Sequence, residues 1–214
     1  KMERMDDAGF FACLIPGKVP EEYEHEVHFA EGITEKVKDA YRYLPGMDGQ
    51  DVDRLNAGIF YESYDRLGAH PMTIGKVSGT FFAVWAPNAV RVSVVGDFNH
   101  WDGRIHQMRR NQESGVFEIF IPDVKPGDCY KYEIKSKGDI LCLKADPYAF
   151  GQQLRPDSAS IVRELSYEWG DGEWMKDREK RQGRDVPVSV YEMYLGSFLR
   201  DKETGEYMNY RDLA

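Results

Sequence analysis

The chain has 214 residues, 42% apolar and 30% charged, which is enough to bury the core of one large or two small domains. Its formal net charge of −9 repels phosphates, and no run of about eighteen apolar residues occurs, so neither nucleic acid nor a membrane is an expected partner. Three scattered cysteines and the lack of a signal-peptide pattern favour a reducing, cytoplasmic location.

The first 45 residues carry a pattern that returns later in the chain. Three segments match three later ones at a near-constant spacing: 7–16 with 113–122, 23–27 with 130–134, and 39–43 with 146–150. A repeat of this kind indicates two copies of one structural unit. The first copy lacks a match to residues 80–112, so we expect residues 1–45 to be a partial β-sandwich module and the chain to start inside a domain.

Residues 46–67 are expected to link the two copies. The segment 51–56 is typical of a short helix, with Asp48 or Asp51 as its N-cap and Gly58 at its end. We therefore predict a helical linker between the modules.

Residues 68–165 are expected to form one antiparallel β-sandwich. Apolar or alternating stretches, separated by turn-forming residues, cover 80–86, 91–95, 116–121, 129–134 and 140–143. In the stretch 129–134, Tyr130, Tyr132 and Ile134 share one face. Strands and turns at this spacing are typical of an immunoglobulin-like sandwich. The expected fold class is therefore all-β, with two such modules in tandem, the first one partial.

Residues 166–186 are predicted to be a linker that contains a charged helix at 173–182. The continuous apolar run 186–191 follows, and it is typical of a strand buried on both faces, as in a parallel sheet. A further helix is expected to begin near residue 209. One strand and the start of one helix do not make a domain, so residues 187–214 are predicted to be the truncated start of another one.

Several motifs together resemble one protein family. The wider resemblance is to carbohydrate-binding modules of the glycogen-binding, isoamylase N-terminal type, and it rests on residues 82–89, 92–103 and 130–133. The narrower resemblance is to the N-terminal part of bacterial 1,4-alpha-glucan (glycogen) branching enzymes, and it rests on residues 67–70, 144–150, 155–160 and 188–197. The last segment is similar to the first strand of the family's (β/α)8 catalytic barrel.

The resemblance implies a whole protein that transfers α-1,4-glucan segments to 6-hydroxyls with retention, using two barrel carboxyl groups. Those groups lie on later barrel strands, so no catalytic residue is expected in this chain and the chain alone is expected to be inactive. The implied partners are α-1,4-glucan (glycogen or malto-oligosaccharide) and the protein's own barrel, with no cofactor and no metal. The alternatives are a non-catalytic glycogen-binding protein, a purely structural sandwich, or the N-terminal region of a debranching enzyme.

Trp101 is the strongest candidate for contact with a sugar. It lies in the polar loop 99–103, where a core tryptophan would be out of place. An indole can stack on the C–H face of a glucose ring while the hydroxyls stay hydrated. The family uses the tryptophan at this motif position on its glucan-binding surface. The alternative is an indole folded back over the edge of the sandwich.

Lys131 and Asn99 are the other candidates for carbohydrate binding. Lys131 lies on the outward face of its strand and matches a family lysine that donates to sugar hydroxyls, although an ordinary solvated lysine is an equal alternative. Asn99 could bond a sugar or stabilise a turn. Family members often carry a second tryptophan in the next hairpin, where residues 138–141 offer only aliphatic side chains, so we expect a weak site. Glu24 takes the place of Lys131 in the first copy.

The other tryptophans are expected to pack rather than bind. Trp85 alternates with Phe81 and Ala83 in a strand, which predicts a core position. Trp169 and Trp174 are expected to pack between the sandwich and the barrel. No histidine has the spacing of a metal ligand.

Overall fold

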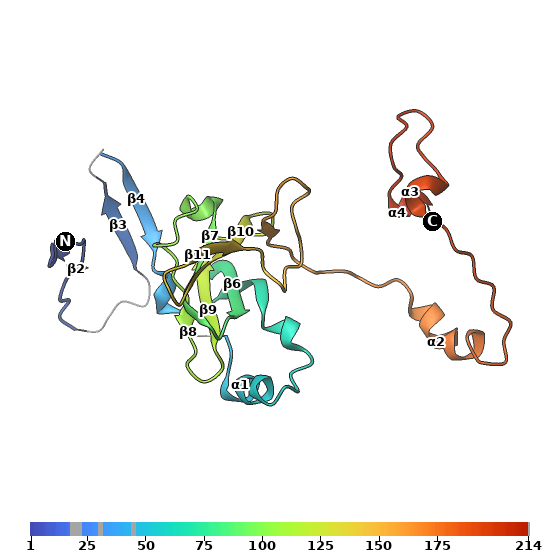
Figure 1. The fold of residues 1–214 in the computed structure, drawn as a ribbon, viewed down its shortest axis with the longest axis horizontal. Coiled ribbons are helices and arrows are strands. Elements are labelled where there is room, and N and C mark those ends of the chain that lie inside the picture. Colours follow the sequence, from blue (N-terminus) through green and yellow to red (C-terminus); the bar gives the residue numbers. More distant parts are fainter. Residues whose placement is uncertain (18–22, 30–31, 44–45, 214) are drawn as a thin grey trace. The chain divides into compact units, whose positions relative to one another are not determined.

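The computed structural model describes residues 1–17, 23–29, 32–43 and 46–213. The chain divides into two compact units, residues 1–165 and 166–214, which we describe separately (Figure 1). None of the helices within the described ranges is long and apolar enough to cross a membrane.

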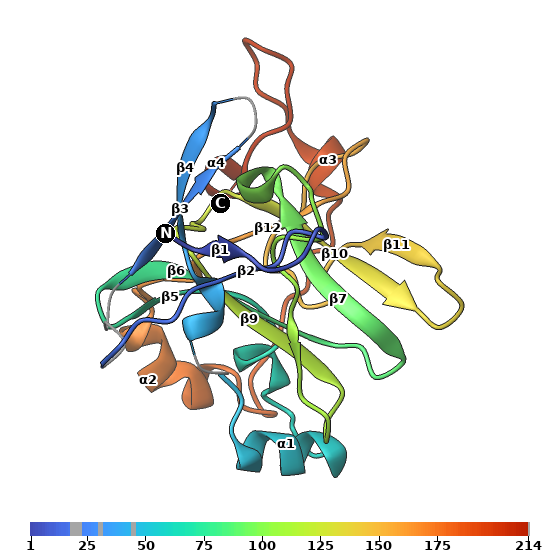
Figure 2. The ribbon, with the colours of Figure 1, turned by 90° about the vertical axis from the view of Figure 1, so that its left-hand side faces the viewer.

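The centre of the first unit is an antiparallel β-sandwich, as the sequence predicts. One sheet has the order β5 (Gly68–Ile74), β6 (Val77–Trp85), β9 (Val116–Pro122), β8 (Arg109–Arg110). In the other sheet, β10 (Cys129–Ser136) pairs with β11 (Leu141–Lys144), β12 (Ser160–Ile161) and β7 (Ala89–Gly96). Figure 2 shows β7 beside β10, with β11 at the edge. All five predicted strands are present, and β5, β8 and β12 are additional.

The core between the two sheets follows the predicted alternation. Tyr130 and Tyr132 of β10 are fully buried, and their aromatic neighbour on the facing sheet is Phe82 of β6. Aliphatic side chains fill the rest of this layer: Val84, Val92, Val94, Ile119, Ile121 and Val162. Burial of these side chains is the main stabilising contribution to the module.

The predicted linker is packed as a third layer. Helix α1 (Gly49–Asn56) begins where Asp48 accepts a hydrogen bond from the Asp51 backbone N–H at 2.9 Å, which confirms Asp48 as the N-cap. Its Val52, together with Met47, Phe60 and Leu67, forms a second apolar cluster. That cluster covers the side of β6 and β9 that faces away from the sandwich core, where its partners are Phe81, Ala83, Val116 and Phe120. Strand β9 is therefore buried on both faces.

A buried carboxylate ties this layer to the sheet. Glu118 of β9 is buried, and its Oε2 accepts the backbone N–H of Met47 at 3.3 Å. Burial raises the pKa of the Glu118 carboxyl group, and the backbone N–H groups of Met47 and Gly46 oppose that rise. The short 3₁₀ helices η1 (Ala40–Arg42) and η2 (Ser63–Asp65) flank the layer.

The N-terminal residues form two hairpins that reproduce hairpins of the sandwich. Strand β1 (Glu3–Arg4) pairs with β2 (Phe11–Ala12) in the register that joins β8 to β9. Strand β3 (Glu24–His28) pairs with β4 (Thr34–Lys38) in the register that joins β10 to β11. The repeat predicted from the sequence is thus a repeat of strand pairing.

The two copies differ in how they bury their apolar face. Phe11 is 53% exposed, whereas its counterpart Phe117 is 2% exposed. Within the residues that the structure describes, each N-terminal hairpin is a separate two-stranded sheet with no second sheet across it. The N-terminal copy therefore repeats the strand pairing of the sandwich but does not form a closed core in its described residues.

The second unit contains three helices and no ladder of strands in its described residues. Helix α2 (Gly172–Arg181) and helix α4 (Tyr210–Leu213) agree with the predicted helices, and α3 (Leu195–Phe198) was not predicted. The strand predicted at 186–191 is not present in this structure: Val188 and Val190 are exposed, and the segment has no regular structure. A strand needs a neighbour for its backbone hydrogen bonds, and none of the described segments pairs with this one.

Candidate functional site

The loop after β7, residues 96–103, is a tight reversal of the backbone, and we call it the Trp101 loop. The 3₁₀ helix η3 (Asp97–Asn99) follows the end of the strand, and His100 and Trp101 then adopt left-handed backbone angles, with φ of 54° and 59°. The Trp101 backbone N–H returns to the Gly96 carbonyl at 2.9 Å. Consecutive left-handed residues other than glycine are uncommon and persist only where surrounding contacts hold them.

Asn99 supplies those contacts from below the loop. It is only 2% exposed, and its Oδ1 accepts the Gly96 N–H at 2.9 Å. Its Nδ2 donates to the Val94 carbonyl at 2.8 Å and contacts His106 Nδ1 at 2.9 Å. The structure therefore favours the turn-stabilising alternative for Asn99. With its amide turned inward, Asn99 does not present a polar atom to a ligand, and we withdraw it as a direct sugar contact.

His106 completes this support. Burial lowers the pKa of its imidazole to about 4, so the ring is neutral at physiological pH and Nδ1 can accept a hydrogen bond from the Asn99 amide. The ring also lies 6.0 Å from the ring of Phe98. A small, uncharged and mostly buried network thus supports the loop.

Trp101 lies on the surface of this supported loop. Its side chain is 37% exposed, so the indole is neither in the core nor free in solvent. Its Nε1–H donates to Asp97 Oδ1 at 2.8 Å. Both N–H groups of Trp101, backbone and indole, are therefore used within the loop, and the ring can offer a ligand its face but no donor. Contact with sugar remains a prediction for this residue.

Lys131 belongs to the same face of the sheet as the Trp101 loop. In β10 it is the cross-strand partner of Val95, the residue just before the loop, and it alternates with the inward Tyr130 and Tyr132. A Cβ atom added to Gly103 of the loop would meet the carboxylate of Glu133, the next residue on the Lys131 side of β10. The loop therefore crosses the face that bears Lys131 and Glu133, which we call the outer face.

Lys131 is already partnered in this structure. Its Nζ donates to Ser158 Oγ at 2.9 Å, and Glu133 pairs with Arg91 at 2.6 Å. A lysine ammonium has three donors, so the bond to Ser158 leaves others for a ligand. Whether Lys131 contacts sugar remains a prediction.

The hairpin after β10 extends the outer face with aliphatic side chains. Leu143 is opposite Glu133 and Leu141 is opposite Lys135, so both leucines lie on the outer face. Both are exposed by about half. The resemblance led us to look for a second tryptophan at 138–141 in this hairpin, and the apolar side chains there are Ile140 and Leu141.

Sequence reasoning missed Asp97 and Ser158 and misplaced Trp85. The spacing of Asp97 from Trp101 could have suggested the first contact, whereas nothing in the sequence links Ser158 to Lys131. Trp85 was predicted to be in the core but is 56% exposed. It is the last residue of β6, and its indole donates to the Ser114 carbonyl at 3.0 Å at the edge of the sheet.

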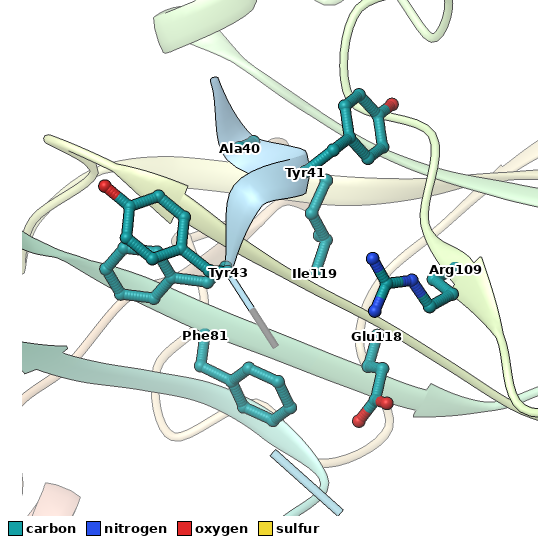
Figure 3. A pocket seen from close by; sticks show the side chains of 8 residues that line it. Ala40, Tyr41, Tyr43, Phe81, Arg109, Glu118 and Ile119 are labelled. Atoms are coloured by element: carbon teal, nitrogen blue, oxygen red, sulfur yellow. The ribbon is translucent and has the colours of Figure 1, made fainter. Parts of the chain in front are cut away.

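The pocket beside Glu118 is not part of this site. Figure 3 shows it between Tyr41 and Tyr43 of the N-terminal segment and Arg109 and Glu118 of the sheet. Its volume of about 10 Å³ leaves room for one water molecule at most. In the parts of the chain that the structure describes, no group of three or more His, Cys, Asp or Glu side chains is arranged to hold a metal ion.

Comparisons with known proteins agree with the predicted resemblance. Residues 66–149 match the family described as carbohydrate-binding module 48 (isoamylase N-terminal domain). The whole chain is 46% identical to part of the 1,4-alpha-glucan branching enzyme GlgB of Rubrobacter xylanophilus and 43% identical to that of Rhodospirillum rubrum. The chain spans 29% of the length of each relative and corresponds to their N-terminal region.

Among solved structures, part of the chain is similar to part of a pullulanase of Klebsiella pneumoniae complexed with maltotriose. The identity is 26% and the TM-score is 0.39, and the match covers 46% of this chain and 10% of the pullulanase chain.

Proposed function

We propose that this chain, an N-terminal branching-enzyme region with a carbohydrate-binding module 48, binds α-1,4-glucan through Trp101 and Lys131. In the whole protein the bound glucan would be held for transfer of α-1,4-linked segments to 6-hydroxyls. The observation that carries the proposal is the Trp101 indole, exposed on a surface loop that the buried Asn99 supports, with its N–H group already satisfied. Such a ring is suited to stacking on a pyranose.

Titration calorimetry with maltoheptaose tests this proposal. Trp101→Ala should weaken binding by ~1–3 kcal/mol, by analogy with the removal of other aromatic stacking partners. Trp85→Ala is the matched control, because Trp85 is also exposed and also has its indole N–H bonded to the protein. Equal affinities for the wild type and both variants would contradict glucan binding at Trp101.

A purely structural role for the sandwich is the second candidate. The observation in its favour is the outer-face hairpin, where Leu141 and Leu143 take the place of an aromatic platform. In that case the leucines would pack against another part of the whole protein. Retention of the wild-type chain on glycogen affinity gels would argue against this candidate.

We also propose that residues 187–214 are the start of the catalytic barrel and that the reacting carboxyl groups lie elsewhere in the whole protein. The exposed valines 188 and 190 support the first point, because they need neighbouring strands to be covered. The chain alone should leave the iodine staining of amylose unchanged, whereas the whole protein should weaken it and form new α-1,6 linkages.

We further propose a cytoplasmic location, which the unpaired Cys13, Cys129 and Cys142 support.

A further inference from the structure

We infer that Asp97 has two functions in the glucan site: it positions the Trp101 indole, and it accepts a hydrogen bond from a sugar hydroxyl. The inference rests on the proposed function and adds a residue that neither the motif nor the family match assigns. Three features of the loop carry it: the indole hydrogen bond, the left-handed backbone, and the second carboxylate oxygen.

The first feature fixes the plane of the ring. Asp97 lies four residues before Trp101, and its Oδ1 accepts the indole Nε1–H at 2.8 Å. The bond joins two surface side chains across the short helix η3, and the indole, at 37% exposure, is only partly covered by other atoms. Without an acceptor at position 97, the indole would lose this restraint, and stacking would have to order the ring to a greater extent.

The second feature explains why the ring needs a tether. Trp101 has a left-handed backbone, which a bulky residue adopts only when other contacts stabilise it. Asn99 holds the base of the loop through Gly96 and Val94, but it does not contact the indole. Asp97 is the residue that links the loop backbone to the ring itself.

The third feature gives Asp97 a ligand contact of its own. Among the described residues, the Asp97 side chain has one hydrogen bond, through Oδ1, and Oδ2 has no partner. An ionised carboxylate only accepts hydrogen bonds, whereas the Lys131 ammonium only donates them. Glucose hydroxyls do both. A stacking ring with one acceptor beside it and one donor on the same face is therefore chemically matched to a glucan.

Two substitutions separate the two functions. Asp97→Asn keeps one carbonyl oxygen for the indole but loses the second acceptor, and Asp97→Ala loses both. We expect the ¹H–¹⁵N resonance of the Trp101 indole in the full chain to stay in place in Asp97→Asn and to move and broaden in Asp97→Ala. Asp102→Asn is the control from the same loop, because Asp102 bonds Arg104 and not the indole. Trp101→Phe assigns the resonance among the four tryptophans.

Binding to maltoheptaose gives the second measurement. We expect Asp97→Asn to lose about fivefold in affinity, the equivalent of one hydrogen bond, and Asp97→Ala to lose about twentyfold or more. An unmoved indole resonance in Asp97→Ala would overturn the positioning function. Wild-type affinity in Asp97→Asn would overturn the hydroxyl contact. If Trp101→Ala binds maltoheptaose as tightly as the wild type, the proposed function itself fails. If Trp101→Ala binds more weakly but Asp97→Ala keeps the wild-type affinity, only the inference about Asp97 is overturned.

Discussion

Tyr130 donates a hydrogen bond to Asp146 over 2.7 Å in the core of the sandwich, and the same bond recurs in the N-terminal copy. There Tyr23 donates to Asp39 over 2.6 Å, each residue standing 107 positions before its counterpart. The carboxylates also match in their second contact, since Asp146 accepts from the Tyr148 N–H and Asp39 from the Tyr41 N–H, both at 2.8 Å. The copies differ in burial, because Tyr130 is fully buried and Tyr23 is not.

The two tyrosine bonds should therefore differ in their contribution to stability. Tyr130→Phe removes a donor from a buried carboxylate that Tyr132 also contacts, and we expect a loss of about 2 kcal/mol in the free energy of unfolding. Tyr23→Phe should cost less than about 1 kcal/mol, because water can replace the lost donor. Urea denaturation of both variants measures the difference, and equal losses would contradict this argument.

The partly buried His106 predicts a dependence of stability on pH. An unfolded histidine titrates near pH 6.5 and folded His106 near pH 4, so the folded chain binds fewer protons between these values. The free energy of unfolding should be at its full value above pH 6.5 and fall as the pH drops toward 4, by up to about 3 kcal/mol.

Carboxyl groups titrate in part of the same pH range and also change the stability. The contribution of His106 is therefore measured as the difference between the wild type and a variant without this histidine. His106→Gln should be less stable than the wild type at pH 7 and should lose less stability between pH 6.5 and 4. Urea denaturation at several pH values gives both curves. Parallel curves would show that His106 does not cause the dependence.

Gly103 leaves room for a side chain only if the Glu133 carboxylate, which pairs with Arg91, moves. A Cβ atom there would meet the Glu133 carboxylate, so Gly103→Ala must displace either the loop or Glu133. We expect a loss of about 1–3 kcal/mol in stability and weaker binding of maltoheptaose. Gly49→Ala is the control, since no heavy atom lies within 4 Å of a Cβ at that position. Wild-type stability and affinity in Gly103→Ala would show that the Glu133 side chain moves aside without cost, and would contradict this prediction.

Lys131 and Ser158 should have unequal effects on binding. Lys131→Met keeps the length of the side chain but removes its donors, and we expect a loss of about tenfold in affinity for maltoheptaose, as for a hydrogen bond from a charged group. Ser158→Ala removes only the resting partner of Lys131, so affinity should change by less than about threefold. The same calorimetric titration measures both, and a larger loss in Ser158→Ala would make that serine the ligand contact.

The strands that were predicted correctly are those whose pattern is local. Val116–Pro122 is apolar except for Glu118, because the linker layer covers one face of the strand and the core covers the other. Cys129–Ser136 alternates because only one of its faces is in the core. Strand β5 escaped prediction because Gly68 and Pro71 interrupt its pattern, and an edge strand tolerates both.

The predictions that failed depend on contacts with distant residues. The run 186–191 has the composition of a buried strand, but composition cannot provide the neighbour that a strand must pair with. Trp85 has the alternation of a core residue, yet its position at the end of β6 decides its exposure. At the site, the motif suggested Trp101 and Lys131, whose contact with sugar stays a prediction, whereas the hydrogen bonds of Asn99, Asp97 and Ser158 follow from three-dimensional contacts.

The cover that residues 47–67 form over β6 and β9 determines where this chain can be divided. Cutting just before residue 66, where the family match begins, would strip Met47, Val52 and Phe60 from the sheet and expose Phe81 and Phe120 to water. The shortened chain would expose an apolar sheet surface and would be prone to self-association. An isolated form of the β-sandwich module should therefore begin upstream of Gly46, so that the backbone amide of Met47 still reaches Glu118.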